Sequence, residues 1–145
     1  MRAEEMWKLF AEKHNLTDEK YEAWAFGGEP DQLAELVLRG QKTATASAYD
    51  LYELEKEPLP RIGDYSVILD ARNEAKCIIQ TTKLYVVPFC EITESHAYKE
   101  GEGDKSLAYW RMVHEQFFSE CLNKVGRDFD EMMNVLCEEF EVVYT

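Results

Sequence analysis

The segment Gly40-Gln41-Lys42-Thr43-Ala44-Thr45-Ala46-Ser47 marks a change from a helical to an extended sequence pattern. Gly40 stands where the C′ glycine of a helix is expected, and small and hydroxyl-bearing residues follow it. A cation such as Lys42, held at this junction beside hydroxyl groups, suits an oxyanion or a nucleophile that must lose a proton. An ordinary surface lysine before a strand rich in threonine is the simpler interpretation of these residues alone. The apolar residues that precede the segment at helical spacing are Leu33, Leu36 and Val37.

The composition is that of one globular domain. The chain has 145 residues, of which 46% are hydrophobic and 31% are charged, so it can bury a core of its own. No apolar run approaches the ~20 residues that span a bilayer. The N-terminal residues 1–5 lack the basic-then-apolar pattern of a secretion signal. We therefore expect a cytoplasmic protein with no membrane span.

The charge balance limits the partners. There are 29 acidic and 16 basic residues, and the formal net charge is -13. Proteins that grip long nucleic acids neutralise several phosphates with a basic face. The balance therefore disfavours duplex DNA and favours a nucleoside or, second, single-stranded RNA. The composition still allows a local basic patch made of Arg39, Lys42, Arg61, Arg72 and Lys83.

The cysteines and histidines show no metal-binding pattern. The four cysteines are dispersed without a Cys-x-x-Cys pair, and the three histidines have no zinc-site spacing. We expect reduced thiols that fill apolar space, no metal and no cofactor.

Apolar periodicity and breaker residues place the elements. Helices are predicted over residues 3–10, 17–24 and 30–39, and from Ser106 to about Asn123 with Gly126 as the breaker. Strands are predicted near Thr45 and over 65–69, 76–87 and 135–144, and the middle two form a hairpin. A helix start is predicted at Thr93, with Glu94 in a capping and helix-dipole role, and His114 on the long helix is predicted to be a hydrogen-bonded core residue.

Gly40, Lys42 and Thr45 form a Gly-x-Lys-x-x-Thr pattern, and several later segments accompany it in order. Together they resemble the ASCH family over about residues 24–144. The resemblance implies an α+β fold related to the PUA RNA-binding domains, namely a small open β-barrel of about five or six mostly antiparallel strands with helices packed around it. It also implies a single domain over 1–145 with an N-terminal helical extension over about 1–26. The accompanying segments are residues 24–27, 36–38, 62–64, 92–94, 103–107 and 110–118.

Locally, at Lys42, Thr45 and residues 93–100, the chain also resembles ASCH proteins that are amidohydrolases of N4-acetylcytidine. This resemblance implies that Lys42 and Thr45 belong to the catalytic site, and that Glu100 does too, because residues 93–100 match the stretch that carries the family's glutamate. Thr45 would supply a hydroxyl, Lys42 a base and Glu100 a proton for the cytosine nitrogen. The expected substrate-binding residues are Arg39, Gly40, Tyr98, Trp110 and Arg111.

Two physical conditions follow for this site. Lys42 acts as a base only with a lowered pKa, which requires a neutral Glu100; otherwise Lys42 is a fixed positive charge for an oxyanion. Residues three apart on a regular strand face opposite sides, so Lys42 is expected in a loop, with regular strand beginning near Thr45. The alternatives are an RNA-binding or regulatory module without catalysis, and a ribonuclease using the same cleft.

Overall fold

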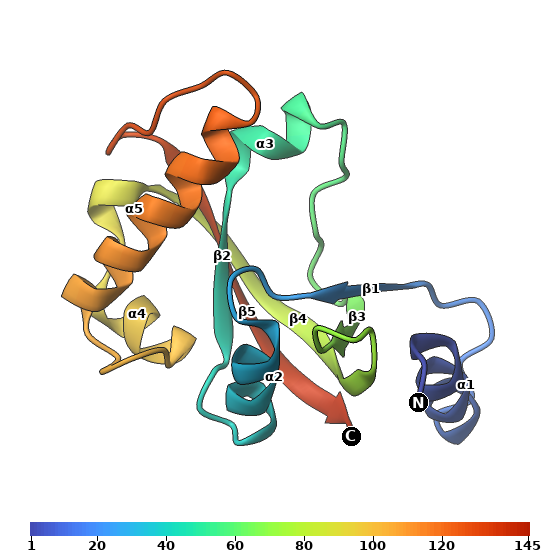
Figure 1. Ribbon diagram of the computed structural model, residues 1–145. Coiled ribbons are helices and arrows are strands. Elements are labelled where there is room, and N and C mark those ends of the chain that lie inside the picture. The colour runs from blue at the N-terminus through green and yellow to red at the C-terminus, as the bar shows by residue number, and fades with distance from the viewer.

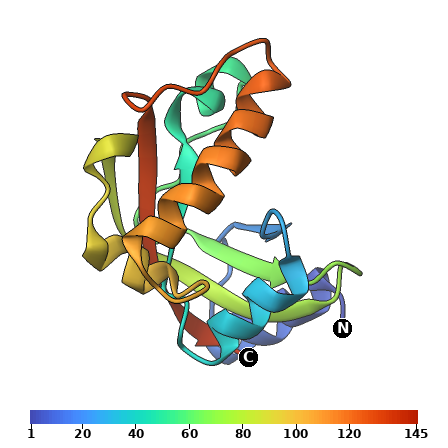
Figure 2. The same ribbon diagram turned by 60° about the vertical axis from the view of Figure 1, so that its left-hand side comes forward.

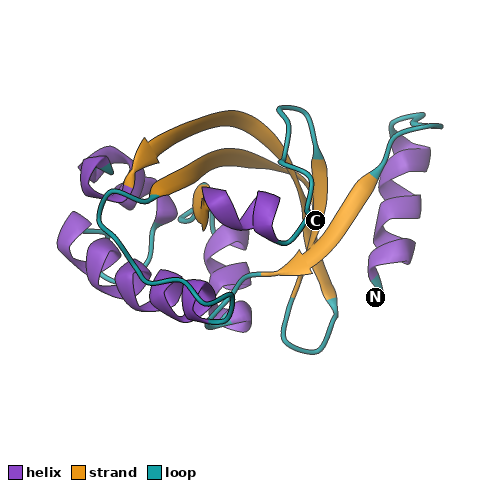
Figure 3. Cartoon of the chain, turned by 90° about the horizontal axis from the view of Figure 1, so that it is seen from above, coloured by secondary structure: helices purple, strands orange, loops and turns teal.

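The computed structural model describes all 145 residues and shows one curled five-stranded sheet surrounded by helices (Figure 1). The strand order is β1-β3-β4-β5-β2, and the β1–β3 pair is parallel while the other three pairs are antiparallel. Seen from above, the long strands curve into a half-barrel (Figure 3). The expected α+β fold and its mostly antiparallel open sheet are confirmed. The strands are β1 (Tyr21–Ala25), β2 (Ala44–Ala48), β3 (Tyr65–Leu69), β4 (Ala75–Pro88) and β5 (Asn134–Tyr144).

The helices lie around this sheet. Helices α4 and α5 lie together at the β2 end of the sheet, and α1 lies at the opposite end (Figures 1 and 2). None of the helices combines the length and the apolar character that crossing a membrane requires. The helices are α1 (Ala3–Lys13), α2 (Pro30–Leu38), α3 (Tyr49–Leu54), the 3-10 turn η1 (Phe89–Glu91), α4 (Glu94–Glu100) and α5 (Leu107–Asn123).

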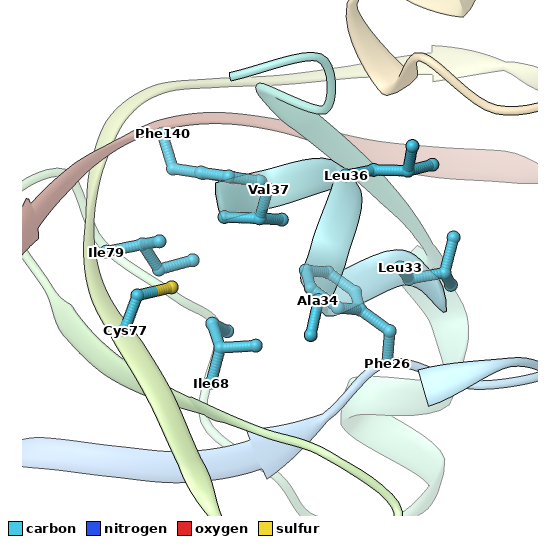
Figure 4. Close-up of a cluster of buried hydrophobic side chains, with 9 residues drawn as sticks. All are labelled: Phe26, Leu33, Ala34, Leu36, Val37, Ile68, Cys77, Ile79 and Phe140. Carbon is cyan, nitrogen blue, oxygen red and sulfur yellow. The ribbon is translucent and has the colours of Figure 1, made fainter. Parts of the chain in front are cut away.

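The central strands are buried on both faces. On β3, Val67 packs in the cluster beneath α1, whereas the next residue, Ile68, packs in the cluster beneath α2. Figure 4 shows the second cluster, in which Val37 of α2 lies with Ile79 of β4 and Phe140 of β5. A strand covered on both sides reads as a continuous apolar run, as 65–69 does in the sequence. A third cluster joins β5 to α4 and α5.

The helix predicted over residues 17–24 is wrong, because Tyr21 and Trp24 lie on strand β1. The strand pairs in parallel with β3, with Tyr21 aligned to Tyr65. The Tyr21 ring stacks on Trp7 of α1 at 4.7 Å, and Trp24 contacts Phe26 edge-on at 4.9 Å. Pairing and aromatic packing therefore override the local helical spacing. The N-terminal region is a helix followed by a strand.

Candidate functional site

The turn that ends α2 fixes the position of Lys42. Gly40 has a φ of +75°, its N–H donates to Val37 O, and the Gln41 N–H donates to Leu36 O. These are the two hydrogen bonds of a Schellman motif, so the predicted C′ glycine is confirmed. The Lys42 N–H also donates to Leu36 O at 3.0 Å. Because β2 begins only at Ala44, Lys42 lies in the loop, as expected.

The Lys42 side chain is buried, with only 2% of the residue exposed. Its Nζ lies 3.2 Å from Glu100 Oε1 and 3.0 Å from Glu102 Oε2, and 5.2 Å from the centre of the Phe26 ring. A buried ammonium requires such partners because it has lost its water. We call this group, Lys42 with Glu100, Glu102 and Phe26, the lysine site.

Glu100 stands at the end of α4 and is contacted by a residue of its own helix and by residues of α5. Its Oε2 lies 2.6 Å from His96 Nε2 and accepts a hydrogen bond from Trp110 Nε1 at 2.5 Å. Its Oε1 faces Lys42 and lies 3.5 Å from His114 Nε2. The carboxylate is therefore surrounded by groups that donate to it.

The hydrogen-bond partners also fix the histidine protons. A carboxylate only accepts hydrogen bonds, so His96 Nε2 carries the proton that it donates to Glu100, while His96 Nδ1 lies 3.2 Å from Tyr85 OH. His114 Nδ1 donates to Trp110 O at 2.8 Å, which places a proton on that nitrogen. The prediction that His114 is a hydrogen-bonded core residue is confirmed.

Glu100 is held in its ionised form. Burial by itself would raise the pKa of Glu100, but the Lys42 and His114 charges outweigh burial and hold this pKa well below its ordinary value. Burial would likewise lower the pKa of His114, but its hydrogen bond to Glu100 raises this pKa above its ordinary value. An ionised Glu100 has no proton for a leaving group. The lowered pKa of Glu100 favours the alternative in which Lys42 is a fixed positive charge rather than a base.

Two capped helices position the partners of Lys42. Thr93 caps α4 by accepting a hydrogen bond from the His96 N–H at 3.1 Å, and Ser106 caps α5 by accepting from the Tyr109 N–H at 3.1 Å. Helix starts were predicted at both places, and both are confirmed. His96 and Glu100 are four residues apart on α4, and Trp110 lies on the first turns of α5. The caps thus set the register of the side chains that surround Glu100.

Thr45 lies on β2 outside this hydrogen-bond network. It is paired across the sheet with Glu138 of β5. Ala46 and Ala48 pack against the cluster beneath α5, so Thr45 points to the other face of the sheet. It is partly exposed, and its hydroxyl makes no hydrogen bond within the protein. The structure thus brings Lys42 and Glu100 together and leaves the Thr45 hydroxyl free.

The expected substrate-binding residues lie in different places. Arg39 is exposed and pairs with Glu35 at 3.3 Å, while Arg111 is exposed and donates to Cys90 O at 3.4 Å. Tyr98 is 63% exposed, and Lys105 Nζ lies 5.2 Å from its ring centre. Of this set, only Trp110 contacts the lysine site. Its ring is stacked on His114 at 4.0 Å, so this face cannot stack on a base.

Sequence reasoning missed three contributors to the site, namely His96, Glu102 and Phe26. His96 carried a usable signal, because a histidine four residues before a helical glutamate shares its face. Glu102 and Phe26 gave none, since Glu102 follows the end of α4 and Phe26 comes from the segment after β1.

The lysine site also includes donors that suit a divalent cation. Glu100, Glu102 and His114 offer atoms that lie within 4.8 Å of one another. However, the Lys42 ammonium already contacts both carboxylates and supplies the positive charge at their centre.

Two surface clefts, of about 370 Å³ and 320 Å³, are lined by neither Lys42 nor Glu100.

Comparison with known proteins identifies the family to which this fold belongs. Residues 22–144 match the ASCH domain family. The chain therefore belongs to the ASCH family, as its Gly-x-Lys-x-x-Thr pattern suggested. No curated protein matches the chain.

Solved structures agree with this assignment. An ASCH domain from Lactobacillus crispatus JV V101 is 31% identical, with a TM-score of 0.87 over 97% of this chain and 96% of that one. A protein from Enterococcus faecalis V583 is 38% identical, with a TM-score of 0.90 over 97% of this chain and 87% of that one. A further hypothetical protein, 20% identical with a TM-score of 0.56 over 85% of this chain and 98% of that one, shares the fold alone.

Proposed function

We propose that this protein is an amidohydrolase of a modified nucleoside such as N4-acetylcytidine, which it converts to cytidine and acetate. The observation that carries the proposal is the buried Lys42 ammonium, held at 3.0–3.2 Å from two carboxylates and three residues before a free strand hydroxyl. A fixed positive charge with little water around it is what a developing oxyanion requires. The resemblance of the motif to the amidohydrolase subgroup supplies the substrate class.

Lys42 is assigned to the acyl oxygen. An ammonium has three N–H donors, and two carboxylates accept from Lys42, so one donor is left for a ligand. Glu100 is a positioning residue in this scheme, because it is ionised and holds Lys42 in place from 3.2 Å. The Glu102 carboxylate, with 19% of its side chain exposed, lies on the more open side of the lysine site.

Thr45 is assigned to the nucleophile. Its Cα lies at most about 11 Å from that of Lys42, because the two residues are three positions apart. The mechanism requires one acyl group to contact both the Lys42 ammonium and the Thr45 hydroxyl. The free Thr45 hydroxyl suits attack on the acyl carbon, with loss of its proton.

RNA binding without catalysis, or RNA cleavage, is the alternative use of the same site. The formal net charge is -13, and three of the five bases of the candidate patch lie beside carboxylates. Lys42 is buried between carboxylates, Arg39 pairs with Glu35, and Lys83 lies 3.9 Å from Glu139. These contacts favour a small, weakly charged substrate over a phosphate backbone.

Hydrolysis of N4-acetylcytidine by the purified protein tests the proposal. Wild type should release cytidine, and Lys42→Met and Thr45→Val should each lower kcat/KM by about 100-fold or more. Thr43→Val is the neighbouring control. The Thr43 hydroxyl donates to Lys99 O and has no part in the proposed mechanism, so this variant should retain activity. Lack of turnover by folded wild type would reject the proposal, and RNA binding would then be tested first.

A further inference from the structure

Strand β5 contributes a carboxyl group that the proposed function does not use. We propose that Glu138 is the general acid–base residue of that reaction, taking the proton of Thr45 Oγ1 and returning it to the cytosine nitrogen. This inference rests on the function proposed above. It fills the role that an ionised and enclosed Glu100 cannot perform.

The first argument is register. Thr45 and Glu138 are direct partners in the antiparallel β2–β5 pair, so their side chains lie on the same face of the sheet. Directly opposed residues have Cβ atoms about 5 Å apart, which is within reach of a glutamate and a hydroxyl. No other carboxyl group is paired with Thr45 in the sheet.

The second argument concerns the partners of Glu138. Thr81 donates to its Oε2 at 2.6 Å, while Oε1 accepts no hydrogen bond and no cation pairs with the carboxyl group. Burial raises the pKa of Glu138, and the nearby Asp64 and Glu22 raise it further, against the opposing effect of the Thr81 hydrogen bond. A carboxyl group that is easier to protonate, with one free oxygen, suits proton transfer in both directions.

The third argument is the route from Glu138 to Lys42. Phe140 follows Glu138 by two residues on β5 and therefore lies on the same face. Its ring is 6.4 Å from that of Phe26, and Phe26 lies beneath the Lys42 ammonium. Both rings belong to the buried cluster beneath α2, which thus extends from the Lys42 ammonium to the face of the sheet that carries Glu138. The proposed mechanism places the substrate acyl group between the two.

The proton transfers balance as follows. Thr45 Oγ1 bonds to the acyl carbon and gives its proton to the Glu138 carboxylate, and the negative charge forms on the oxygen that faces Lys42. The bond from carbon to N4 breaks, and Glu138 gives this proton to N4, which releases cytidine. Water then attacks the Thr45 ester and passes a proton to Glu138. The carbon–Oγ1 bond breaks, Oγ1 recovers the proton, and the acid leaves.

Replacement of the carboxyl group tests this role. Glu138→Gln should lower kcat/KM for N4-acetylcytidine by about 100-fold or more, the usual contribution of a general acid or base. It should unfold at the same temperature as wild type or higher, because it no longer buries an ionisable carboxyl group. Glu141→Gln, a change at an exposed carboxyl of the same strand, is the matched control and should retain activity.

The outcomes separate the two proposals. Full activity of Glu138→Gln beside an active wild type would overturn the role of Glu138 and leave the hydrolase function standing. An inactive wild type would overturn the hydrolase function, and this inference with it. Glu138→Asp provides a second test if the amide variant does not fold. It keeps the carboxyl group at shorter reach, so activity between those of wild type and Thr45→Val is expected, and unchanged activity would count against proton transfer at this position.

Discussion

Lys42 lies in a medium where charge interactions are strong. Its ammonium is enclosed by two carboxylates and an aromatic ring, and the nearer residues of α4 and α5 exclude water from Glu100. In such surroundings a charge is stabilised only by its partners, so the loss of one partner affects the others directly.

Removing the cation alone should therefore be more harmful than removing the pair. Lys42→Met should lower the free energy of unfolding by about 3–5 kcal/mol, because it leaves Glu100 buried without its main counter-charge. Adding Glu100→Gln should restore a large part of this loss. Urea denaturation of the two single variants and the double variant measures the coupling. Additive effects would contradict a direct Lys42–Glu100 interaction.

His114 gives the site a pH dependence with a defined sign. Its pKa is raised in the folded state, so its stabilising contribution is complete below the ordinary value of 6.5 and is lost as the pH rises through the raised value. The stability difference between wild type and His114→Asn should thus be larger at about pH 6 than at about pH 9. Denaturation curves at both pH values measure it. A difference that grows with pH would show that His114 is not protonated beside Glu100.

At the scale of elements, the short helix α4 carries the central carboxylate. The helix has only seven residues, and the Thr93 hydroxyl holds its first turn. A helix of this length depends on its cap and on tertiary packing, because propensity alone does not maintain it. The position of Glu100 is therefore linked to Thr93, seven residues earlier.

Loss of this cap should destabilise the protein and loosen the site together. Thr93→Ala should cost about 1 kcal/mol in the free energy of unfolding, and Thr93→Ser should cost less because it keeps the hydroxyl. Chemical denaturation measures both changes. Equal losses for Ala and Ser would contradict the capping role and indicate a contribution from the threonine methyl group instead.

Elements with local end signals were predictable from the sequence, whereas those formed by distant pairing were not. Gly40 and Ser106 mark helix ends through their own backbone conformation and hydrogen bonds, so they could be read directly. Strand β1 was read as a helix because its partner β3 begins about 40 residues later. Helix α3, over Tyr49–Leu54, has no side-chain cap and no buried residue, and it was not predicted.

The candidate site shows the same division. Lys42 and Glu100 were predicted through the motif, and the structure brings them into contact across 58 residues of sequence. Glu102 and Phe26, which also contact Lys42, were not predicted as site residues, because nothing in their local sequence specifies which side chain they will face. The ionised state of Glu100 likewise depends on four donors from three segments, which only the fold assembles.

At the scale of the whole molecule, the helices that pack on the two ends of the sheet have separate roles. Helix α1 covers one end through Met6 and Phe10, while α4 and α5 build the lysine site at the other (Figure 1). Phe10 is only 3% exposed and packs against Tyr65 and Tyr144. The core beneath α1 thus stabilises the domain without contacting the groups around Lys42.

This separation predicts that stability and site geometry can be changed independently. Phe10→Ala should lower the free energy of unfolding by about 3–5 kcal/mol, because it leaves a cavity beneath α1. The folded fraction should nevertheless retain the lysine site, since no contact of Lys42, Glu100 or His114 involves α1. Comparison of the pH dependence of stability in Phe10→Ala with that in wild type measures this, because both should lose the same His114 contribution between about pH 6 and pH 9. A changed pH dependence would show that the two ends of the sheet are coupled, and that α1 takes part in positioning the site.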